Sequence, residues 1–151
     1  MQVVVAAPGP SLKDFVFSER SGKLPLIGCG SVPTYIHCDY WTINDESNIR
    51  NIPSPPTVIY AHPRMFIPTA RYIDPNIPYG GTSGGLAVMV AADILGYTEI
   101  GLVGFDGHGL PNNFKSSFDK DIIGRLTAKG VRLYSLMKDS IFNKGLECLN
   151  V

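Results

Sequence analysis

The sequence has no excess of charge of either sign, because 13 Lys and Arg residues balance 13 Asp and Glu residues. A chain without net charge gives no electrostatic reason to expect nucleic acid or an anionic membrane surface as a partner. Cysteines are also few. Cys29, Cys38 and Cys148 are an odd number without CxxC spacing, which argues against a disulfide framework and against a structural zinc site. We therefore expect a reducing compartment and no metal site.

Long hydrophobic runs are absent as well. The first residues, MQVVVAAPGPS, contain no charged segment, and their apolar run is too short for a signal peptide or a membrane span. We expect a cytoplasmic protein without a membrane span. The apolar content is nevertheless 44%, enough for one hydrophobic core in a chain of 151 residues. Residues 1–151 are thus expected to form a single domain.

Short segments rich in Val, Ile and Leu alternate with helical or irregular connections. Strands are predicted at 2–7, 24–27, 35–43, 57–61, 99–104 and 131–136. Helices are predicted at 11–16, 84–95 and 118–129, with a closing helix from Ser140. Three prolines between 66 and 78 exclude a long helix there. This order favours a three-layer Rossmann-like fold, with a mostly parallel sheet of about six strands and helices on both faces.

The stretch from Tyr79 to His108 organises the chain. A Gly-rich turn containing Thr82, Ser83 and Gly84 leads into an apolar helix, for which Gly96 is the expected left-handed end. Free N–H groups and the positive end of the helix dipole suit an anionic ligand. In the alternative interpretation, Ser83 is only the N-cap and the glycines only let the helix pack on the sheet.

Polar groups follow several predicted strands, and the carboxyl ends of parallel strands meet at one edge, where such sheets bind ligands. They are Gly9-Pro10-Ser11, Gly30, Asn44, His62 and Asp106-Gly107-His108. The first turn could hold a phosphate or be a plain strand–turn–helix joint. Asn44 could hydrogen-bond a ribose or base, or belong to an ordinary turn.

Three segments resemble the bacterial sialyltransferases of glycosyltransferase family 42 and the related motility-accessory-factor-like proteins, which include 6-hydroxymethylpterin pyrophosphokinase-like cores. They are VVVAAPGPSLKDF at the start, TSGGLAVMVAADILGYTEIGLVGFD in the middle and VRLYSLMKDSIF near the end. The family has a Gly-Pro-Ser-Leu turn in the first segment, and Thr-Ser-Gly followed by Gly-Ile-Asp in the second. The resemblance covers roughly two-thirds of the chain and transfers fold better than reaction.

The resemblance implies a site for a cytidine nucleotide sugar, with the family aspartate at Asp106 and a nucleotide-contacting asparagine at Asn44. The residues that it places near ribose and phosphate are Gly9, Pro10, Ser11, Thr82, Ser83 and Gly84. Gly30 stands where the family has another asparagine. The family's long lid, with its catalytic histidine, is trimmed here to 109–130, so His108 is a candidate base chosen from this sequence and not carried over.

We therefore expect a nucleotide-sugar-binding, sialyltransferase-like glycosyltransferase that takes a CMP-sugar as donor substrate, with Asp106 and His108 as catalytic residues. Its partner would be a small-molecule nucleotide or nucleotide sugar. One alternative is a non-catalytic nucleotide-binding module of a larger assembly. Another is a magnesium-dependent diphosphotransferase. Because the lid is short, a neighbouring subunit of a homo-oligomer could complete the pocket.

Overall fold

The computed structural model describes residues 2–16, 24–44, 58–79, 82–105 and 122–136, and the backbone of 147–148. The strands in these ranges are β1 (Gln2–Ala6), β2 (Leu26–Cys29), β3 (Tyr40–Ile43), β4 (Val58–Ala61), β5 (Arg71–Tyr72), β6 (Glu99–Val103), β7 (Arg132–Ser135) and β8 (Glu147–Cys148). The helices there are α1 (Ser11–Val16), the 3-10 helix η1 (Val32–Thr34), α2 (Ser83–Met89), the π-helical η3 (Val90–Ile94) and α4 (Arg125–Ala128).

The described strands form one sheet in the order β5-β4-β3-β2-β1-β6-β7-β8, and every neighbouring pair is parallel. The predicted Rossmann-like α/β fold is thus confirmed, with eight described strands where the sequence predicts about six. The strand order reverses between β1 and β6. In open parallel sheets the crevice at such a reversal, beyond the carboxyl ends of the strands, is where ligands bind.

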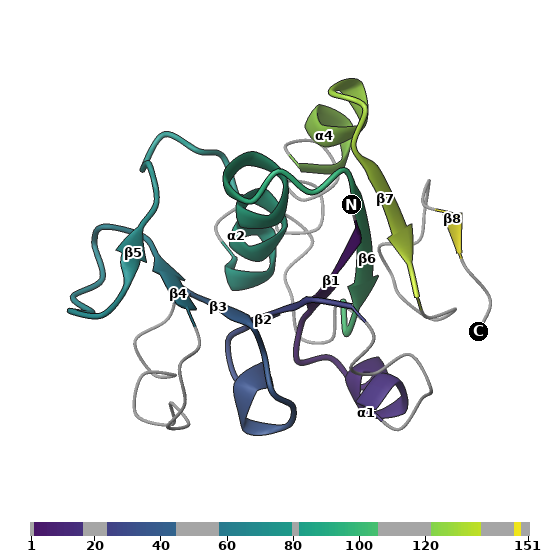
Figure 1. The fold of residues 1–151 in the computed structure, drawn as a ribbon, viewed down its shortest axis with the longest axis horizontal. Helices are drawn as coiled ribbons and strands as arrows, with labels where there is room; N and C mark the ends of the chain where they lie inside the picture. The colour runs from purple at the N-terminus through teal and green to yellow at the C-terminus, as the bar shows by residue number, and fades with distance from the viewer. Residues whose placement is uncertain are drawn as a thin grey trace.

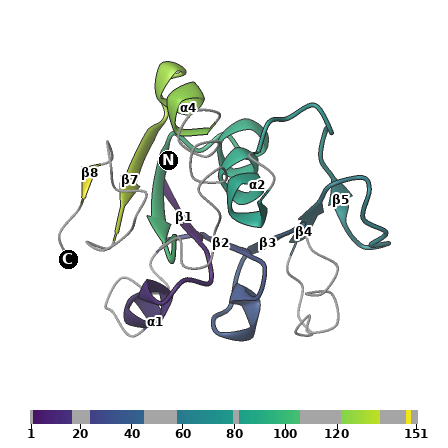
Figure 2. The same ribbon diagram turned by 180° about the vertical axis from the view of Figure 1, so that it is seen from behind.

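Helices cover both faces of the sheet (Figure 1), and the reverse view shows the same layers (Figure 2). In β1, Val3 and Val5 pack into the core beneath α2 and α4, whereas Val4 and Ala6 pack into the core beneath α1 and η1. Successive side chains of a strand point to opposite faces, so a run of small apolar residues suits a strand buried on both sides. Burying each valine contributes about 1.5–3 kcal/mol.

The structure corrects the sequence prediction at two strands. The strand predicted at 35–43 begins only at Tyr40, because Val32–Thr34 forms η1 with a proline in its first turn. The proline-rich segment predicted as irregular contains β5, whose backbone pairs with β4 at the edge of the sheet. Gly96 has a φ of 74° at the end of the helix, as predicted. The closing helix predicted from Ser140 lies outside the described residues.

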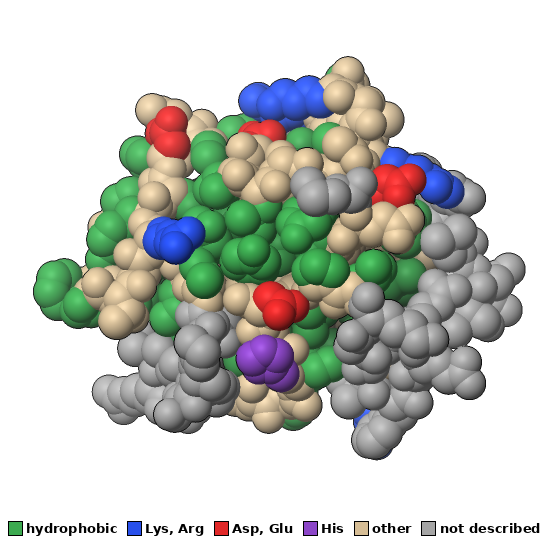
Figure 3. Space-filling model, in the orientation of Figure 1, with side chains coloured by type: hydrophobic (Ala, Val, Ile, Leu, Met, Phe, Trp, Pro, Cys, Tyr) green, Lys and Arg blue, Asp and Glu red, His purple; other side chains and the backbone are tan. Residues whose placement is uncertain are grey.

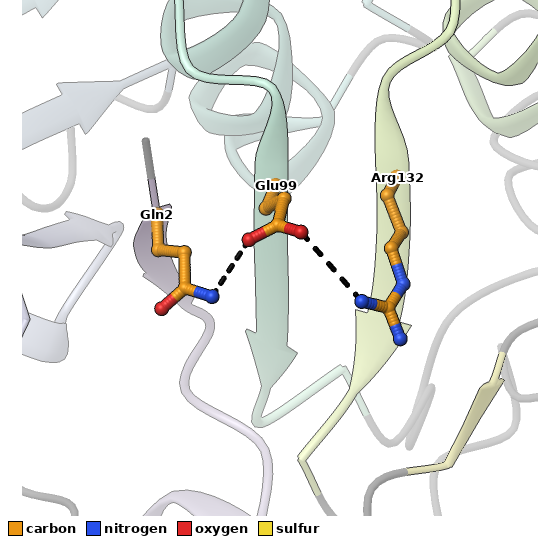
Figure 4. Close-up of polar contacts among 3 residues, drawn as sticks. All are labelled: Gln2, Glu99 and Arg132. Atoms are coloured by element: carbon orange, nitrogen blue, oxygen red, sulfur yellow. Dashed lines mark hydrogen bonds and ion pairs between the residues drawn. The ribbon is translucent and has the colours of Figure 1, made fainter.

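The amino ends of β1, β6 and β7, which are neighbours in the sheet, are joined by side chains (Figure 4). Glu99 of β6 accepts a hydrogen bond of 2.6 Å from Gln2 of β1 and lies 3.6 Å from Arg132 of β7. These residues are also register partners across the sheet. On the face in Figure 3, hydrophobic side chains cover the middle, over α2, and charged side chains lie mainly at the margins. In the part of the chain that the structure describes, no helix has the length and apolarity needed to cross a membrane.

Candidate functional site

The turn after β1 is fastened to the end of β6. The N–H of Ala7 donates to the carbonyl of Val103 at 2.9 Å, and the N–H of Gly9 donates to the carbonyl of Gly104 at 2.9 Å. In return, the N–H of Gly104 donates to Ser11 Oγ at 3.0 Å. Ser11 exposes only 9% of its surface, so this bond satisfies a buried amide. The predicted turn Gly9-Pro10-Ser11 therefore lies at the reversal between β1 and β6.

Gly104 makes this junction possible. Its φ is 74°, a left-handed conformation that residues with a side chain rarely adopt. A Cβ at this position would also lie 1.8 Å from the carbonyl oxygen of Ala7. The junction thus depends on glycine for both its conformation and its space.

The start of α2 is capped by Thr82, whose extended backbone has φ −117° and ψ 154° and whose Oγ1 accepts from the N–H of Gly85 at 3.0 Å. The interpretation of Ser83 as the N-cap is therefore wrong. Ser83 instead holds α2 against the end of β3. Its Oγ accepts from the N–H of Asn44 at 3.1 Å, and its carbonyl accepts from Thr42 Oγ1 at 3.1 Å.

The next residue of α2, Gly84, lies against the ring of Phe105. A methyl group added at Gly84 would lie 2.8 Å from Phe105 Cε1. Phe105 directly follows Gly104, which holds Ser11. The contacts thus run from Asn44 through Ser83 and α2 to the end of β6 and the turn after β1. We call this the carboxyl-edge row. The predicted site residues Gly9-Pro10-Ser11, Asn44 and Thr82-Ser83-Gly84 all lie in this row. Their role toward a ligand stays a prediction.

A polar cluster surrounds Asn44. The Nη2 atom of Arg64, from the loop after β4, lies 2.6 Å from Asn44 Oδ1 and 3.1 Å from its carbonyl oxygen. The hydroxyl of Tyr79 lies 3.4 Å from the same Oδ1. The ring of His62 is 5.9 Å from the ring of Tyr79, centroid to centroid. Four segments of the chain therefore meet at the ends of β3 and β4: the end of β3 with Asn44, the loop after β4 with Arg64, the segment with Tyr79, and the start of α2.

The contacts of His62 fix its tautomer. Its Nδ1 accepts a hydrogen bond of 3.1 Å from the N–H of Arg64. Because Nδ1 is an acceptor, the hydrogen of the neutral ring is on Nε2. In this arrangement Nε2 of the neutral ring can donate a hydrogen bond to a ligand.

Gly30, another predicted ligand residue, is buried and bonded internally. Its N–H donates to the carbonyl of Thr42 at 3.2 Å, and its carbonyl accepts from Trp41 Nε1 at 2.8 Å. Both of its polar groups thus hold β2 to β3. The predicted catalytic residues Asp106 and His108 lie outside the described residues.

Cys29 and Cys38 lie under opposite faces of the sheet, and both are buried. Burial is the main cause that raises the pKa of each thiol from 9.0 to about 12, helped by Cys38 for Cys29 and by Asp39 for Cys38. Near neutral pH both are uncharged thiols, which are poor nucleophiles. Among the described residues, no three His, Cys, Asp or Glu side chains gather closely enough to hold a metal ion.

Sequence reasoning missed Arg64 and Tyr79 as neighbours of Asn44. The segment His62-Pro63-Arg64 directly follows a predicted strand, so a cation at the carboxyl edge could have been found from the sequence. Tyr79 gives no such signal, since it lies 35 residues from Asn44 in the chain.

A parallel sheet with its order reversed beside β1, polar groups at its carboxyl edge and helices on both faces defines a Rossmann-like protein. The sequence matches no protein-family model and no curated protein.

Solved structures of sialyltransferases share this fold. The sialyltransferase CST-II in complex with a trisaccharide acceptor and CMP aligns with a TM-score of 0.66 and 16% identity, over 99% of this chain and 86% of that one. A variant of CST-II in complex with CMP gives 0.67 and 15%, over 99% and 87%. An apo α-2,3-sialyltransferase from Campylobacter jejuni gives 0.62 and 17%, over 99% and 80%. At the level of the fold, the expected resemblance to the family 42 sialyltransferases is confirmed.

Proposed function

We propose that this protein binds a cytidine nucleotide sugar at the carboxyl edge of its sheet and is a sialyltransferase-like glycosyltransferase. The observation that carries the proposal is the carboxyl-edge row at the reversal of strand order. In it, Asn44 and Ser83 are hydrogen-bonded to each other, and Ser11 is connected to them through Gly104 and the approach of Phe105 to Gly84. The complexes of CST-II with CMP support a cytidine nucleotide as the ligand.

Each part of the row has a proposed task. The turn Gly9-Pro10-Ser11 and the start of α2 at Thr82-Ser83-Gly84 would lie near the ribose and phosphate of the donor. Hydroxyls suit this task because each can accept a backbone N–H and still donate its own hydrogen. Asn44 would hydrogen-bond the nucleotide. These are the residue types that fix the orientation of a ligand in a largely preformed site.

In the proposed reaction, a hydroxyl oxygen of the acceptor attacks the anomeric carbon of the donor sugar. The bond between that carbon and the phosphate oxygen breaks, and CMP leaves with the bonding electrons. His108 takes the proton of the acceptor hydroxyl as general base, and Asp106 orients the donor or acceptor. Nothing in this step requires a metal ion.

Binding and transfer can be measured separately. Calorimetric titration with CMP, CDP, UDP, GDP and NAD should give binding for CMP and not for NAD. A transfer assay with a CMP-sugar donor and an oligosaccharide acceptor should then give a product, and the His108→Ala variant should lose it. Full transfer by His108→Ala would reject that residue as the base.

Two other outcomes would replace the proposal. Binding of CMP without turnover would support a non-catalytic nucleotide-binding module. Turnover that needs magnesium and transfers a diphosphate would support a diphosphotransferase. Failure to bind any of the nucleotides would contradict the whole proposal.

A further inference from the structure

Arg64 brings a positive charge to the carboxyl edge of a chain that has no net charge. It is exposed, and it follows β4, next to the end of β3 in the sheet. In the described part of the chain, no carboxylate forms an ion pair with it. Its side chain instead donates to neutral groups, the carbonyl and amide oxygens of Asn44, and its backbone N–H donates to the ring nitrogen of His62. Among the described residues, hydrogen bonds therefore hold the guanidinium in place, and its positive charge has no ion-pair partner.

These bonds hold the side chain of Asn44 in one orientation. Its Oδ1 faces both Arg64 Nη2, at 2.6 Å, and the hydroxyl of Tyr79, at 3.4 Å. A cation can only be a donor, so the amide oxygen and not the amide nitrogen must face Arg64. The NH2 group consequently lies on the other side of the amide. Ser83 Oγ fixes the backbone of the same residue by accepting its N–H.

Within the described ranges, only one nitrogen of the guanidinium is engaged. Both bonds to Asn44 come from Nη2, and an arginine has five N–H donors in a planar fork that matches the oxygens of a carboxylate or phosphate. The backbone N–H of Arg64 donates to His62 Nδ1 at 3.1 Å, which fixes the start of the loop. A preorganised group of this kind costs less entropy to bind than a free surface arginine.

We propose that Arg64 is the residue by which this site selects anionic ligands: its guanidinium binds an oxyanion of the donor while it orients the Asn44 amide toward the same molecule. The inference rests on the proposed function and adds to it the residue that distinguishes a nucleotide from a nucleoside. The oxyanion could be the phosphate of the nucleotide or the carboxylate of a sialic acid on it. Both offer the same chemistry to the arginine fork.

The test compares Arg64→Gln with Arg71→Gln in the full chain. Arg71 is also exposed and belongs to the same segment after β4, so the control removes an equal charge outside the cluster. Calorimetry measures the binding of cytidine, CMP and CMP-N-acetylneuraminate. For Arg64→Gln we expect about a tenfold loss of CMP affinity, the lower end for a charge-assisted bond, and little change for cytidine. Arg71→Gln should bind all three as the wild type does.

The ligands separate the two oxyanions. Equal losses for CMP and CMP-N-acetylneuraminate would assign Arg64 to the phosphate, and a loss for CMP-N-acetylneuraminate alone would assign it to the carboxylate. Arg64→Lys, which keeps the charge but lacks the fork, should recover only part of the loss. Thermal unfolding of each variant shows whether the fold is intact.

Three results would overturn the inference. An unchanged affinity for both CMP and CMP-N-acetylneuraminate in a folded Arg64→Gln variant would do so, as would equal losses in the two Gln variants. An equal loss for cytidine and CMP would reduce Arg64 to a structural role. In all of these the wild type still binds, so the proposed function survives. A wild type that binds none of the three ligands would overturn both.

Discussion

The hydroxyl groups predicted to meet a ligand also hold the backbone in place. Ser11 accepts from Gly104, Thr82 from Gly85, and Ser83 from Asn44, at 3.0 to 3.1 Å. A hydroxyl that accepts one bond keeps its own hydrogen for a second. The structural and ligand-binding interpretations of these residues are therefore compatible, and substitutions at them should affect stability even when no ligand is present.

Ser11→Ala should lower the free energy of unfolding by about 1–3 kcal/mol, because it leaves the buried N–H of Gly104 without its acceptor. Urea unfolding followed by circular dichroism measures this. The control is Ser31→Ala, since Ser31 is partly exposed and its side chain does not cap η1. The control should stay within about 0.5 kcal/mol of the wild type. Equal stability of the two variants would show that the Ser11 bond contributes nothing.

Single residues at the site were only partly predictable. Asn44 could be chosen from the sequence because it follows a strand, and strand ends meet at one edge of a parallel sheet. Arg64 also follows a predicted strand and could have been placed at the same edge, but its contact with Asn44, like that of Tyr79, could not be predicted, since side-chain contacts between loops depend on the paths of those loops. Gly30 also follows a predicted strand, but the structure uses its polar groups inside the sheet.

Among the elements, the strands buried on both faces were the most predictable. β1 and β6 consist mainly of Val, Ile and Leu, and β7 has three buried residues in a row; all three occur where the sequence predicts them. The start of β3 and the whole of β5 were missed. In both regions prolines interrupt the apolar pattern, and backbone pairing with β4, which leaves no local trace in the sequence, decides that Arg71–Tyr72 is a strand.

The junction between β1 and β6 should be the least tolerant of substitution among these elements. Gly96 and Gly104 share a φ of 74°, but a Cβ at Gly96 would meet nothing within 4 Å, whereas one at Gly104 would lie 1.8 Å from the Ala7 carbonyl oxygen. Gly96→Ala should cost only the conformational penalty of about 1–2 kcal/mol. Gly104→Ala should cost more, because the backbone of the junction must also move.

Thermal unfolding of these two variants tests the difference. If Gly104→Ala melted at or above the temperature of Gly96→Ala, the close approach of the two backbones at this junction would be refuted. Nucleotide affinity gives a second measurement, since a displaced turn at Gly9-Pro10-Ser11 should weaken CMP binding in Gly104→Ala only.

For the molecule as a whole, the buried thiols make the free energy of unfolding change with pH in the alkaline range. The pKa of Cys29 and of Cys38 is about 12 in the folded chain and 9.0 without burial. Between these values the unfolded chain loses protons that the folded chain keeps, so the free energy of unfolding falls as pH rises above about 9. Below the lower value both states hold the protons, and the thiols have no effect.

The Cys29→Ala variant isolates this contribution from other groups that titrate at high pH. Urea unfolding at pH 8 and pH 10 should show a loss of stability that is about 1.4 kcal/mol smaller in the variant than in the wild type. An identical loss in both proteins would mean that Cys29 ionises as easily in the folded chain as in the unfolded one.

The two edges of the sheet differ in character. The amino edge is closed by Gln2, Glu99 and Arg132, which satisfy one another across β1, β6 and β7. The carboxyl edge collects hydroxyls, glycines and Arg64, which has no ion-pair partner in the described part of the chain. The sequence could predict this division because parallel strands align their ends, and it could predict the layers from the apolar pattern.

The most direct test of the account is a titration of the isotope-labelled protein with CMP, followed by two-dimensional proton–nitrogen NMR. We expect the amide signals of the carboxyl edge to shift, namely those of Gly9, Ser11, Asn44, Ser83 and Gly84. The signals of Gln2, Glu99 and Arg132 at the amino edge should stay in place. Shifts confined to the amino edge, or no shifts at all at saturating CMP, would contradict the claim that this fold binds a nucleotide where its strands end.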